Sequence, residues 1–387
     1  MGVLVPGSEL RLAGSASDLT GSGASSILRL MTVDSGHDGA LHWVGKALRR
    51  KWHLDALIGT GGMANVYAAT HRNGRRGAIK LLKPELNVHA EVRERFLREG
   101  YVANRIQHPG LVGIVDDDET EDGLAFLVME LLSGESLQDR LARDPAVPPA
   151  EALFIADQVL DVLQAAHEAQ VVHRDIKPGN IFVLDDGRVK LLDLGLARVL
   201  EGRKAAVAMT QKGMVLGTVP FMAPEQAQGK PELVTAQSDI YALGATLFFV
   251  LSGQYVHEHE NKMDRLLATM RDPARSLARA ADGIPSSVVR VVDRALAFRP
   301  RDRWGSAAEM QEAVRGAYEE LAQRPIPKTR RVCVQGVQGW VRPVHHDAEL
   351  ATEPMTAASL SISVVFEADL SQGVASVPID VDVSEDA

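Results

Sequence analysis

Alternating apolar and polar positions predict a small sheet in the central region of the chain. Four short runs carry this pattern: WHLDALI at 52–58, ANVYAAT at 64–70, RGAIKLL at 76–82 and LAFLVMEL at 124–131. Turn residues such as RNGR separate the runs. The stretch HAEVRERFLREGYVANRI at 89–106 has a helical pattern instead. We therefore expect a small sheet with one helix.

The pattern then becomes helical. Behind prolines suited to a helix start, apolar residues recur at spacings of four and three: Ala152, Ala156, Val159, Leu163 and Ala166. The stretch SDIYALGATLFFVLSG is apolar nearly all round, as expected of a helix buried at the centre of a lobe, and Gly253 suits its C-terminal cap. The second part of the domain is predicted to be mostly helical.

Composition divides the chain into three parts. Residues 1–50 include the Gly- and Ser-rich stretch AGSASDLTGSGASS, and we expect this segment to be disordered. Residues 51–322 carry the strand and helix patterns of a folded domain. Residues 323–387 begin as a linker and continue as an acidic tail, whose role as partner site, intramolecular contact or solubilising segment stays open.

The net charge of -9 is concentrated in the tail. No Lys or Arg follows Arg342, so residues 1–342 are formally neutral. The nine acidic residues after that position are Asp347, Glu349, Glu353, Glu367, Asp369, Asp380, Asp382, Glu385 and Asp386. The sequence thus shows no basic footprint, and we expect no nucleic-acid ligand.

Length and composition favour a soluble globular protein. The 387 residues, 45% hydrophobic and 24% charged, suffice for two lobes plus tails. The start MGVLVPGSEL lacks a signal-peptide pattern, and the most apolar stretch, YALGATLFFVLSG, is too short to span a bilayer. The single cysteine, Cys333, cannot form an internal disulfide. These features predict a cytoplasmic protein without membrane insertion.

Candidate chemistry begins at IGTGGMANVY. Gly59, Gly61 and Gly62 lie between two predicted strands, where bare backbone N–H groups could approach an anion, although an ordinary turn is the alternative. Lys80 follows among apolar neighbours, and lysines are rarely buried without a partner. Glu99 in the predicted helix is an available carboxylate.

A second group of polar residues lies in VVHRDIKPGN, residues 171–180. Asp175 could accept a proton from a substrate hydroxyl, Asn180 could offer a carbonyl oxygen to a hard cation, and Lys177 could neutralise phosphate charge. Asp193 in LLDLG could bind the same metal, although alone it would be an ordinary turn residue. Two such oxygen ligands, with waters and phosphates, suit Mg²⁺.

In their order along the chain, these motifs resemble the eukaryotic-like (Hanks-type) bacterial serine/threonine protein kinases. The resemblance covers residues 51–322 and comprises GTGGMANVY, AIK, LREG, HPGLV, VMELLSGESL, HRDIKPGN, DLG, GTVPFMAPEQ, SDIYALG and RDRW. It implies an α+β, bilobal protein-kinase fold, with an antiparallel sheet and one helix in the N-lobe and a mainly helical C-lobe. It also implies ATP and Mg²⁺, with Mn²⁺ as an alternative, and protein substrates.

The resemblance assigns roles to individual residues. The catalytic residues it implies are Asp175, as the base, with Lys80, Lys177 and Asn180. The metal ligands it implies are Asn180 and Asp193. Met129 would be the gatekeeper, and backbone groups of Glu130 and Leu132 would meet the adenine ring. The ATP-binding set is Ile58, Gly59, Thr60, Gly61, Gly62, Met63, Ala64, Asn65, Val66, Ala78, Lys80, Glu99, Met129, Glu130 and Leu132.

Two features of the resemblance imply Ser/Thr acceptors, namely Lys177 two residues beyond Asp175, and Thr218. Other residues would be structural. Glu225 would pair with Arg303, and Asp239 at the start of the apolar helix would brace the catalytic-loop backbone.

The activation loop would run from residue 193 to residue 225. Arg174 would bind a phosphorylated residue of this loop, and Thr210 is the expected autophosphorylation site, with an unmodified loop threonine as the alternative. Lys212 stands where bacterial relatives often have a second threonine. A transient homodimer could carry out this reaction in trans.

The chain departs from the family pattern at several positions. Ala64 replaces the third glycine, and Leu194 replaces the usual aromatic residue after the metal-binding aspartate, where leucine can still fill an apolar slot. QYVHEHENKMDRLL replaces a frequent Pro-Phe pair, which puts the substrate-docking surface in question. His257 and His259 could suggest a metal, but a solvated loop is favoured because no further ligands are evident.

Three other classes of protein fit less well. A pseudokinase would usually lack one of four residues that are all present, namely Lys80, Asp175, Asn180 and Asp193. A membrane-spanning sensor kinase would need an apolar segment of about 20 residues. A small-molecule phosphotransferase would not be expected to combine the APE motif with an activation loop and Arg174.

Overall fold

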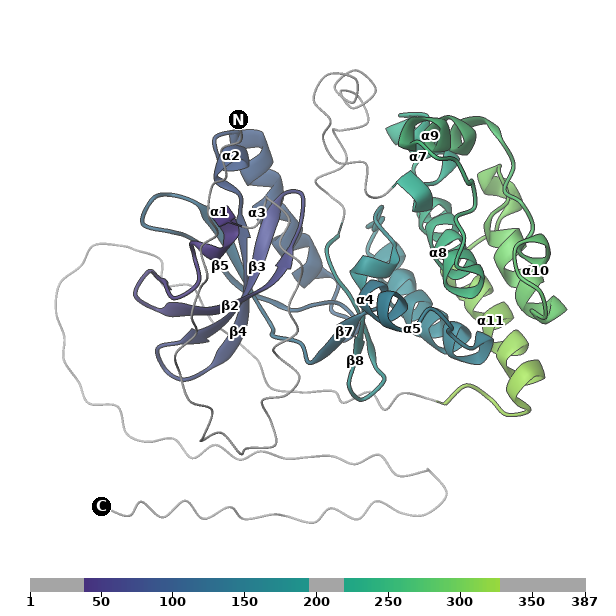
Figure 1. Ribbon diagram of the computed structural model, residues 1–387, viewed down its shortest axis with the longest axis horizontal. Coiled ribbons are helices and arrows are strands. Elements are labelled where there is room, and N and C mark those ends of the chain that lie inside the picture. Colours follow the sequence, from purple (N-terminus) through teal and green to yellow (C-terminus); the bar gives the residue numbers. More distant parts are fainter. Residues whose placement is uncertain (1–37, 195–218, 328–387) are drawn as a thin grey trace, which may run out of the picture. The chain divides into compact units, whose positions relative to one another are not determined.

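The structure is a computed structural model that describes residues 38–194 and 219–327. It contains a six-stranded antiparallel sheet, in the order β1-β2-β3-β4-β6-β5, and a helical part (Figure 1). The strands are β1 (Ala47–Leu48), β2 (Trp52–Thr60), β3 (Ala64–His71), β4 (Arg76–Leu82), β5 (Ile114–Glu119) and β6 (Ala125–Met129). The expected α+β kinase-like arrangement of an antiparallel sheet and a mainly helical second part is confirmed.

Both faces of this sheet are covered, which explains the continuous apolar run in β4. Every residue from Gly77 to Leu82 is buried. Ile79 packs with Phe126 on one face, whereas Leu82 packs with Phe96 on the other. Phe96 lies on α3 (Ala90–Arg105), which follows the short helix α2 (Pro84–Asn87). Helix α3 is therefore the single long helix that covers the sheet.

Ordered structure begins before residue 51, where the sequence predicts the start of the domain, because residues 38–50 already contribute a helix and a strand. Helix α1 (Asp38–Leu41) and β1 precede that boundary. Leu48 is 1% exposed, and the hydroxyl of the buried Tyr67 donates to the carbonyl oxygen of Ala40 at 2.8 Å. Periodicity could not indicate this segment because its ordered elements are only two to four residues long. Residues 1–37 lie outside the described part.

Strand β5 was also not expected from the sequence. It reads IVDDDE, and none of its residues is fully buried. Acidic residues are depleted in strands, so the local pattern gives no strand signal. The strand forms because β6, whose five residues are all buried, offers it a ladder of backbone hydrogen bonds.

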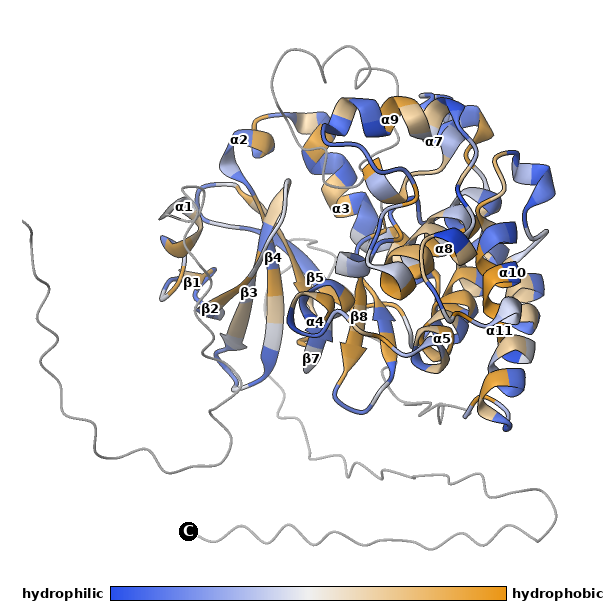
Figure 2. Cartoon of the chain, turned by 45° about the vertical axis from the view of Figure 1, so that its right-hand side comes forward, coloured by the Kyte–Doolittle hydropathy of each residue, from blue (hydrophilic) through white to orange (hydrophobic). Residues whose placement is uncertain are grey.

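The helical part is organised around the apolar helix α8 (Ala236–Ser252), as expected, and Gly253 ends it with a φ of +69°. Helix α5 (Pro149–Glu168) packs beside it and buries all five residues of the predicted apolar stripe. Figure 2 shows hydrophobic stretches, in orange, on both helices, and their buried residues belong to one core cluster. The other helices are α4 (Leu137–Arg143), α7 (Pro224–Ala227), α9 (Lys262–Arg271), α10 (Ser286–Ala295) and α11 (Ala307–Ala322).

Short elements complete the described part of the chain. Strands β7 (Gly134–Ser136), β8 (Ile181–Leu184) and β9 (Val189–Leu191) form a three-stranded sheet. The 3-10 turns are η1 (Pro178–Asn180), η3 (Val219–Phe221), η4 (Pro231–Leu233), η5 (Leu277–Arg279) and η6 (Pro300–Asp302). Within the described ranges, no helix is both long enough and apolar enough to cross a membrane.

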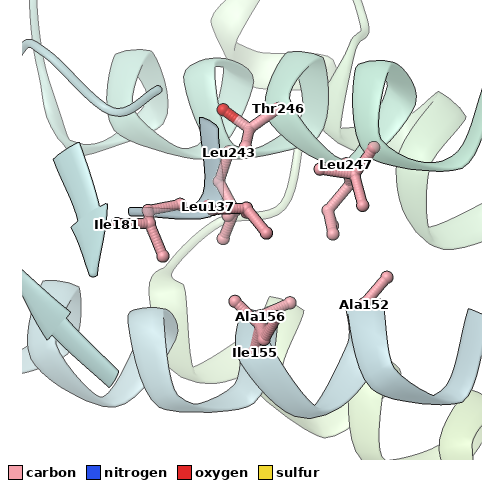
Figure 3. A pocket seen from close by; sticks show the side chains of 9 residues that line it. Leu137, Ala152, Ile155, Ala156, Ile181, Leu243, Thr246 and Leu247 are labelled. Carbon is pink, nitrogen blue, oxygen red and sulfur yellow. The ribbon is translucent and has the colours of Figure 1, made fainter. Parts of the chain in front are cut away.

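A small gap remains in the helical core between α4, α5, β8 and α8 (Figure 3). Its volume is about 10 Å³, and its lining includes Leu137, Ile155, Ile181 and Leu243. The hydroxyl of Thr246, its one polar side-chain group, donates to the carbonyl oxygen of Ala242 on its own helix. A cavity of this size holds at most about one water molecule, so we interpret it as a packing defect and not a ligand site.

Close packing of α8 against α10 gives a prediction for stability. A Cβ atom at Gly244 would lie 2.8 Å from the Cβ atom of Ala295. We expect Gly244→Ala to lower the free energy of unfolding by about 1–3 kcal/mol through overpacking, measured by urea denaturation. Gly316→Ala is the matched control, because nothing lies within 4 Å of the position that its methyl group would take on α11. That variant should gain about 0.5–1 kcal/mol, and equal effects of both substitutions would contradict this account.

Candidate active site

Lys80 lies at the centre of the site, in the middle of the larger sheet. Its strand β4 is paired on both sides, with Val66 of β3 and Leu127 of β6 opposite Lys80. The ammonium group lies 3.0 Å from a carboxylate oxygen of Glu99 on α3 and 2.6 Å from one of Asp193 after β9. Two carboxylates from distant parts of the sequence therefore anchor one cation.

Burial and charge act on these three groups in different directions. Burial alone would lower the pKa of Lys80, but the charges of Asp193 and Glu99 outweigh it and raise the pKa above its ordinary value. Burial raises the pKa of Glu99 to about 7, despite the opposing charge of Lys80. Partial burial would raise the pKa of Asp193, but Lys80 holds it below its ordinary value. Lys80 and Asp193 are therefore both charged at neutral pH.

The loop that carries Asp175 is held by a buried carboxylate. Asp239 is 0% exposed and lies in the first turn of α8, where the helix dipole favours a negative charge. It accepts hydrogen bonds from the backbone N–H groups of His173, at 2.8 Å, and Arg174, at 2.7 Å. His167 Nε2 forms a third contact with it at 2.8 Å. Arg174 adopts a left-handed φ of +68°, a conformation that this bracing supports.

Asp175 itself is 7% exposed and is oriented by two neighbours. Lys177 Nζ lies 2.9 Å from its Oδ2 atom. Asn180 Nδ2 donates to the same Oδ2 at 2.9 Å and to the backbone carbonyl of Asp175 at 2.8 Å. Because the amide nitrogen of Asn180 faces Asp175, its carbonyl oxygen is directed elsewhere, as a metal ligand requires.

Asp193 is tied to the same loop through the backbone. The N–H group of Leu192 donates to the carbonyl oxygen of Asn180 at 2.9 Å. Asp193 has a left-handed φ of +50°, which is strained for a non-glycine residue. The next residue, Leu194, is 2% exposed and packs in the core of the helical part, so the leucine fills an apolar slot.

The donor set fits Mg²⁺. Asp193 has a side chain that is 45% exposed, and the hydrogen bond from the N–H group of Leu192 to the carbonyl oxygen of Asn180 joins its segment to the one that carries Asn180. Among the described residues, no group of three or more His, Cys, Asp or Glu side chains is arranged to hold a metal. A metal held here would therefore depend on phosphate and water for its other ligands, which is the usual coordination of Mg²⁺.

The glycine-rich stretch forms the turn between β2 and β3. The N–H group of Gly61 donates to the carbonyl oxygen of Ala64 at 2.9 Å and closes this turn. Ala64 is 4% exposed, so the fold accommodates the methyl group that stands in place of a third glycine. Ile58 remains 49% exposed, and Val66 lies opposite Lys80 in the sheet. The remaining residues of the predicted set here are Gly59, Thr60, Gly62, Met63 and Asn65.

The connection after β6 lies on the other side of Lys80. Met129 is 7% exposed and pairs with Ala78, which is 4% exposed. The carboxylate of Glu130 accepts a hydrogen bond from the N–H group of Gly113 at 2.6 Å and forms an ion pair with Lys190 of β9. Leu132 follows with a half-buried side chain. Val66 of β3 thus lies opposite Lys80, and Met129 of β6 lies opposite Ala78 on the same strand as Lys80, whereas the nucleotide contacts of the predicted set stay a prediction.

Arg303 and Glu225 form the most completely satisfied ion pair of the described chain segments. Two parallel bonds join the guanidinium to the carboxylate, at 2.8 and 2.9 Å. The three other N–H groups of Arg303 donate to backbone carbonyls of Gln237, Ala297 and Phe298. Burial alone would raise the pKa of Glu225, but the hydrogen bonds and charge of Arg303 hold it below its ordinary value.

Several contacts were missed by the sequence analysis. The Lys190–Glu130 pair, the contact of His167 with Asp239, and a 3.1 Å hydrogen bond from Gln226 to the carbonyl of Arg174 have no local sequence signal. Each joins segments that are at least 52 residues apart in the chain. Thr210, Lys212 and Thr218 lie outside the described residues.

The segment that replaces the frequent Pro-Phe pair still contributes an aromatic residue. Tyr255 stacks on Phe249 at 4.8 Å between ring centroids and meets Phe221 edge-on at 6.0 Å. Arg265 lies over the Tyr255 ring at 4.6 Å. Phe221 belongs to η3, so the three rings pack together at that turn. The segment that replaces the Pro-Phe pair therefore still supplies an aromatic contact there.

Comparisons with known proteins agree with this geometry. Residues 52–318 match the family model described as the protein kinase domain. The probable serine/threonine-protein kinase PknB of Corynebacterium glutamicum is 38% identical over 67% of this chain and 41% of its own length. The serine/threonine-protein kinase PrkC of Bacillus subtilis is 35% identical over 71% of this chain and 42% of its own length. The chain thus spans about two fifths of each of these curated relatives.

A solved structure is also similar. The crystal structure of the Mycobacterium tuberculosis PknI kinase domain is 26% identical, with a TM-score of 0.54. The match covers 70% of this chain and 98% of that domain.

The ion pair between Arg303 and Glu225 should contribute to the free energy of unfolding in a way that depends on pH. Because the pKa of Glu225 is lower in the folded than in the unfolded state, its contribution is fully present above its ordinary pKa of 4.5 and is lost as pH falls through the lower folded value. At pH 7 we expect Arg303→Ala to cost about 3–5 kcal/mol, measured by denaturant titration, since it leaves a buried charge without a partner. The free energy of unfolding of Glu225→Gln should fall less steeply below pH 4.5 than that of the parent. A melting curve of Arg303→Ala that matches the parent would count against the assignment.

Proposed function

Since the chain belongs to the protein kinase family, in its bacterial serine/threonine branch, we propose that it transfers the γ-phosphate of ATP to Ser and Thr hydroxyls of proteins. The observation that supports this most is the convergence of Lys80, Glu99 and Asp193 with Asp175 and Asn180. Phosphoryl transfer requires alignment and charge neutralisation more than covalent chemistry from the protein, and these residues can supply both.

In the proposed reaction, the substrate hydroxyl oxygen forms a bond to the γ-phosphorus while the bond from that phosphorus to the β–γ bridging oxygen breaks and ADP leaves. The hydroxyl proton passes to the carboxylate of Asp175. Asn180 and Lys177 hold this carboxylate in one orientation, and Lys177 can also offset phosphate charge. Mg²⁺, held by Asn180 and Asp193, would neutralise charge on the phosphates.

Nucleotide binding follows from the residues around Lys80. Lys80 would contact the α- and β-phosphates while Glu99 keeps its ammonium in place. The turn between β2 and β3 offers backbone N–H groups to the phosphates, and the backbone of Glu130 and Leu132 would meet the adenine. The carboxylate of Glu130 is held by its contacts with Gly113 and Lys190.

Ser/Thr selectivity rests on Lys177 and on the names of the relatives, which are serine/threonine kinases. We further propose that the protein acts in cytoplasmic signalling and activates itself by phosphorylating Thr210, in a transient homodimer. Arg174, whose backbone is fixed by Asp239 and Gln226, would bind that phosphate.

The first test is transfer itself. Purified full-length protein with Mg²⁺ and labelled ATP should incorporate label, whereas Asp175→Asn should be about 10²- to 10⁴-fold slower because it loses the proton acceptor. Asp282→Asn, an exposed aspartate in the helical part, is the matched control and should retain the parent rate. A parent protein that binds ATP but transfers no label, even after prior phosphorylation, would favour a nucleotide-binding scaffold.

The second test concerns activation. Mass spectrometry of the labelled protein should locate phosphate at Thr210, and Thr210→Ala should have a reduced rate on an added protein substrate. Thr210→Ser should restore the rate, since it keeps an acceptor hydroxyl for the same phosphate. Undiminished activity of Thr210→Ala would rule out this site as the switch and leave the transfer proposal intact.

A further inference from the structure

Two turns of the larger sheet lie side by side at the end opposite the glycine-rich turn. One connects β1 to β2 and includes Arg49, Arg50 and Lys51, and the other connects β3 to β4. The N–H group of Arg72 donates to the carbonyl oxygen of Lys51 at 2.7 Å, so the two turns are in direct contact. We refer to residues 49–51 and 72–76 together as the basic tip.

The basic tip carries a local excess of positive charge, although the formal net charge of residues 1–342 is zero. Its exposed cations are Arg49, Arg50, Lys51, Arg72, Arg75 and Arg76. Neither turn contains an acidic residue. Arg49 lies 3.5 Å from Asp118, and Arg76 lies 3.6 Å from Asp55. The other four cations form no salt bridge with any residue that the structure describes. Formal neutrality of residues 1–342 therefore allows a local basic surface, and the expectation that the chain binds no nucleic acid stays a prediction.

The backbone of the first turn is unusual for arginine. Arg49 and Arg50 have φ values of +49° and +52°, and the N–H group of Lys51 donates to the carbonyl oxygen of Leu48 at 2.9 Å. Two consecutive positive φ values belong to a turn that Asn-Gly favours and that strains other residues. Strain at two consecutive exposed arginines is a reason to look for a function of their side chains.

Exposed apolar residues precede this turn. Leu41 is 50% exposed and Val44 is 36% exposed. Between them lies Trp43, with the ammonium of Lys46 4.9 Å from its ring centroid. The segment is fixed to the sheet because the N–H group of Gly45 donates to the carbonyl oxygen of Leu54 at 2.8 Å. Leu41 and Val44 are thus exposed on the segment that leads into the basic turn, whereas Trp43 packs against the cluster of Leu48, Leu54 and Tyr67.

We propose that the basic tip and the segment from Leu41 to Lys46 form a peripheral binding surface for an anionic phospholipid bilayer. Adjacent turns project their cations outward and can meet a flat, negatively charged surface. Leu41 and Val44 are exposed apolar side chains on the neighbouring segment and can enter the headgroup region. Nucleic acid or an acidic protein would match the charge but would leave these apolar side chains without a role.

The test uses full-length protein and vesicles of phosphatidylcholine, with or without an equal part of phosphatidylglycerol, at about 0.1 M salt, where charge acts over about 10 Å. The parent should cosediment with the anionic vesicles only. Arg49→Asn combined with Arg50→Gly should lower the binding constant about thirty-fold, about five-fold for each cation removed. These are the residues that the turn favours, so the variant should melt no earlier than the parent, and its kinase activity without vesicles should be unchanged.

Control variants distinguish binding through this surface from a general effect of the net charge of the protein. Arg279→Gln combined with Arg290→Gln removes two exposed cations from the helical part and should leave binding intact. Leu41→Ser combined with Val44→Ser should reduce the binding that persists at high salt. Absence of cosedimentation by the parent, or equal losses in the tip and control variants, would overturn the proposal. Tip-dependent binding of polyglutamate or duplex DNA without vesicle binding would also overturn it, in favour of that polyanion.

Discussion

The buried carboxylate of Asp239 is the constraint on which the rest of the site depends. It is inaccessible to water, yet its charge is satisfied by two backbone N–H groups and His167. Asp239 lies in the first turn of α8, the helix at the centre of the helical core. Its hydrogen bonds therefore fix a loop without regular structure to that core. The left-handed Arg174 and the direction of Asp175 follow from that anchoring.

The charged side chains around Lys80 differ in their exposure to solvent: those of Lys80 and Glu99 form a closed, buried side, and that of Asp193 forms an open, exposed side. Lys80 and Glu99 have side chains that are 11% and 12% exposed, whereas that of Asp193 is 45% exposed. The closed side fixes the position of a cation at a site where water cannot weaken its field. The open side leaves a carboxylate available to ligands. This asymmetry lets one buried ion pair organise chemistry that takes place beside it.

Local pattern and the resemblance predicted most of the fold but few of its long-range contacts. Helix α5 follows from periodicity because it buries a regular face, whereas α8 and strands β4 and β6 follow from apolar runs that are buried nearly all round. Strand β5 was missed because its acidic residues carry no strand signal, and β1 because two residues show no period. Residue types suggested a partner for Lys80, but its double contact with Glu99 and Asp193 needs the folded structure. Glu130 and Lys190 are 60 residues apart in the chain, so their contact also needs the folded structure.

The segment before β2 has a practical consequence for anyone who shortens this chain. The family match begins at residue 52, but the first strand of the sheet, β1, begins at Ala47. Helix α1, whose Ala40 accepts the hydrogen bond of Tyr67, begins at Asp38. A fragment cut at the limits of the match would expose Leu54 and the hydroxyl of Tyr67, and β2 would become an open edge. Open edges recruit strands from other molecules, so such a fragment would be prone to aggregate in expression. The part of the chain that folds therefore begins before the part that the family model matches.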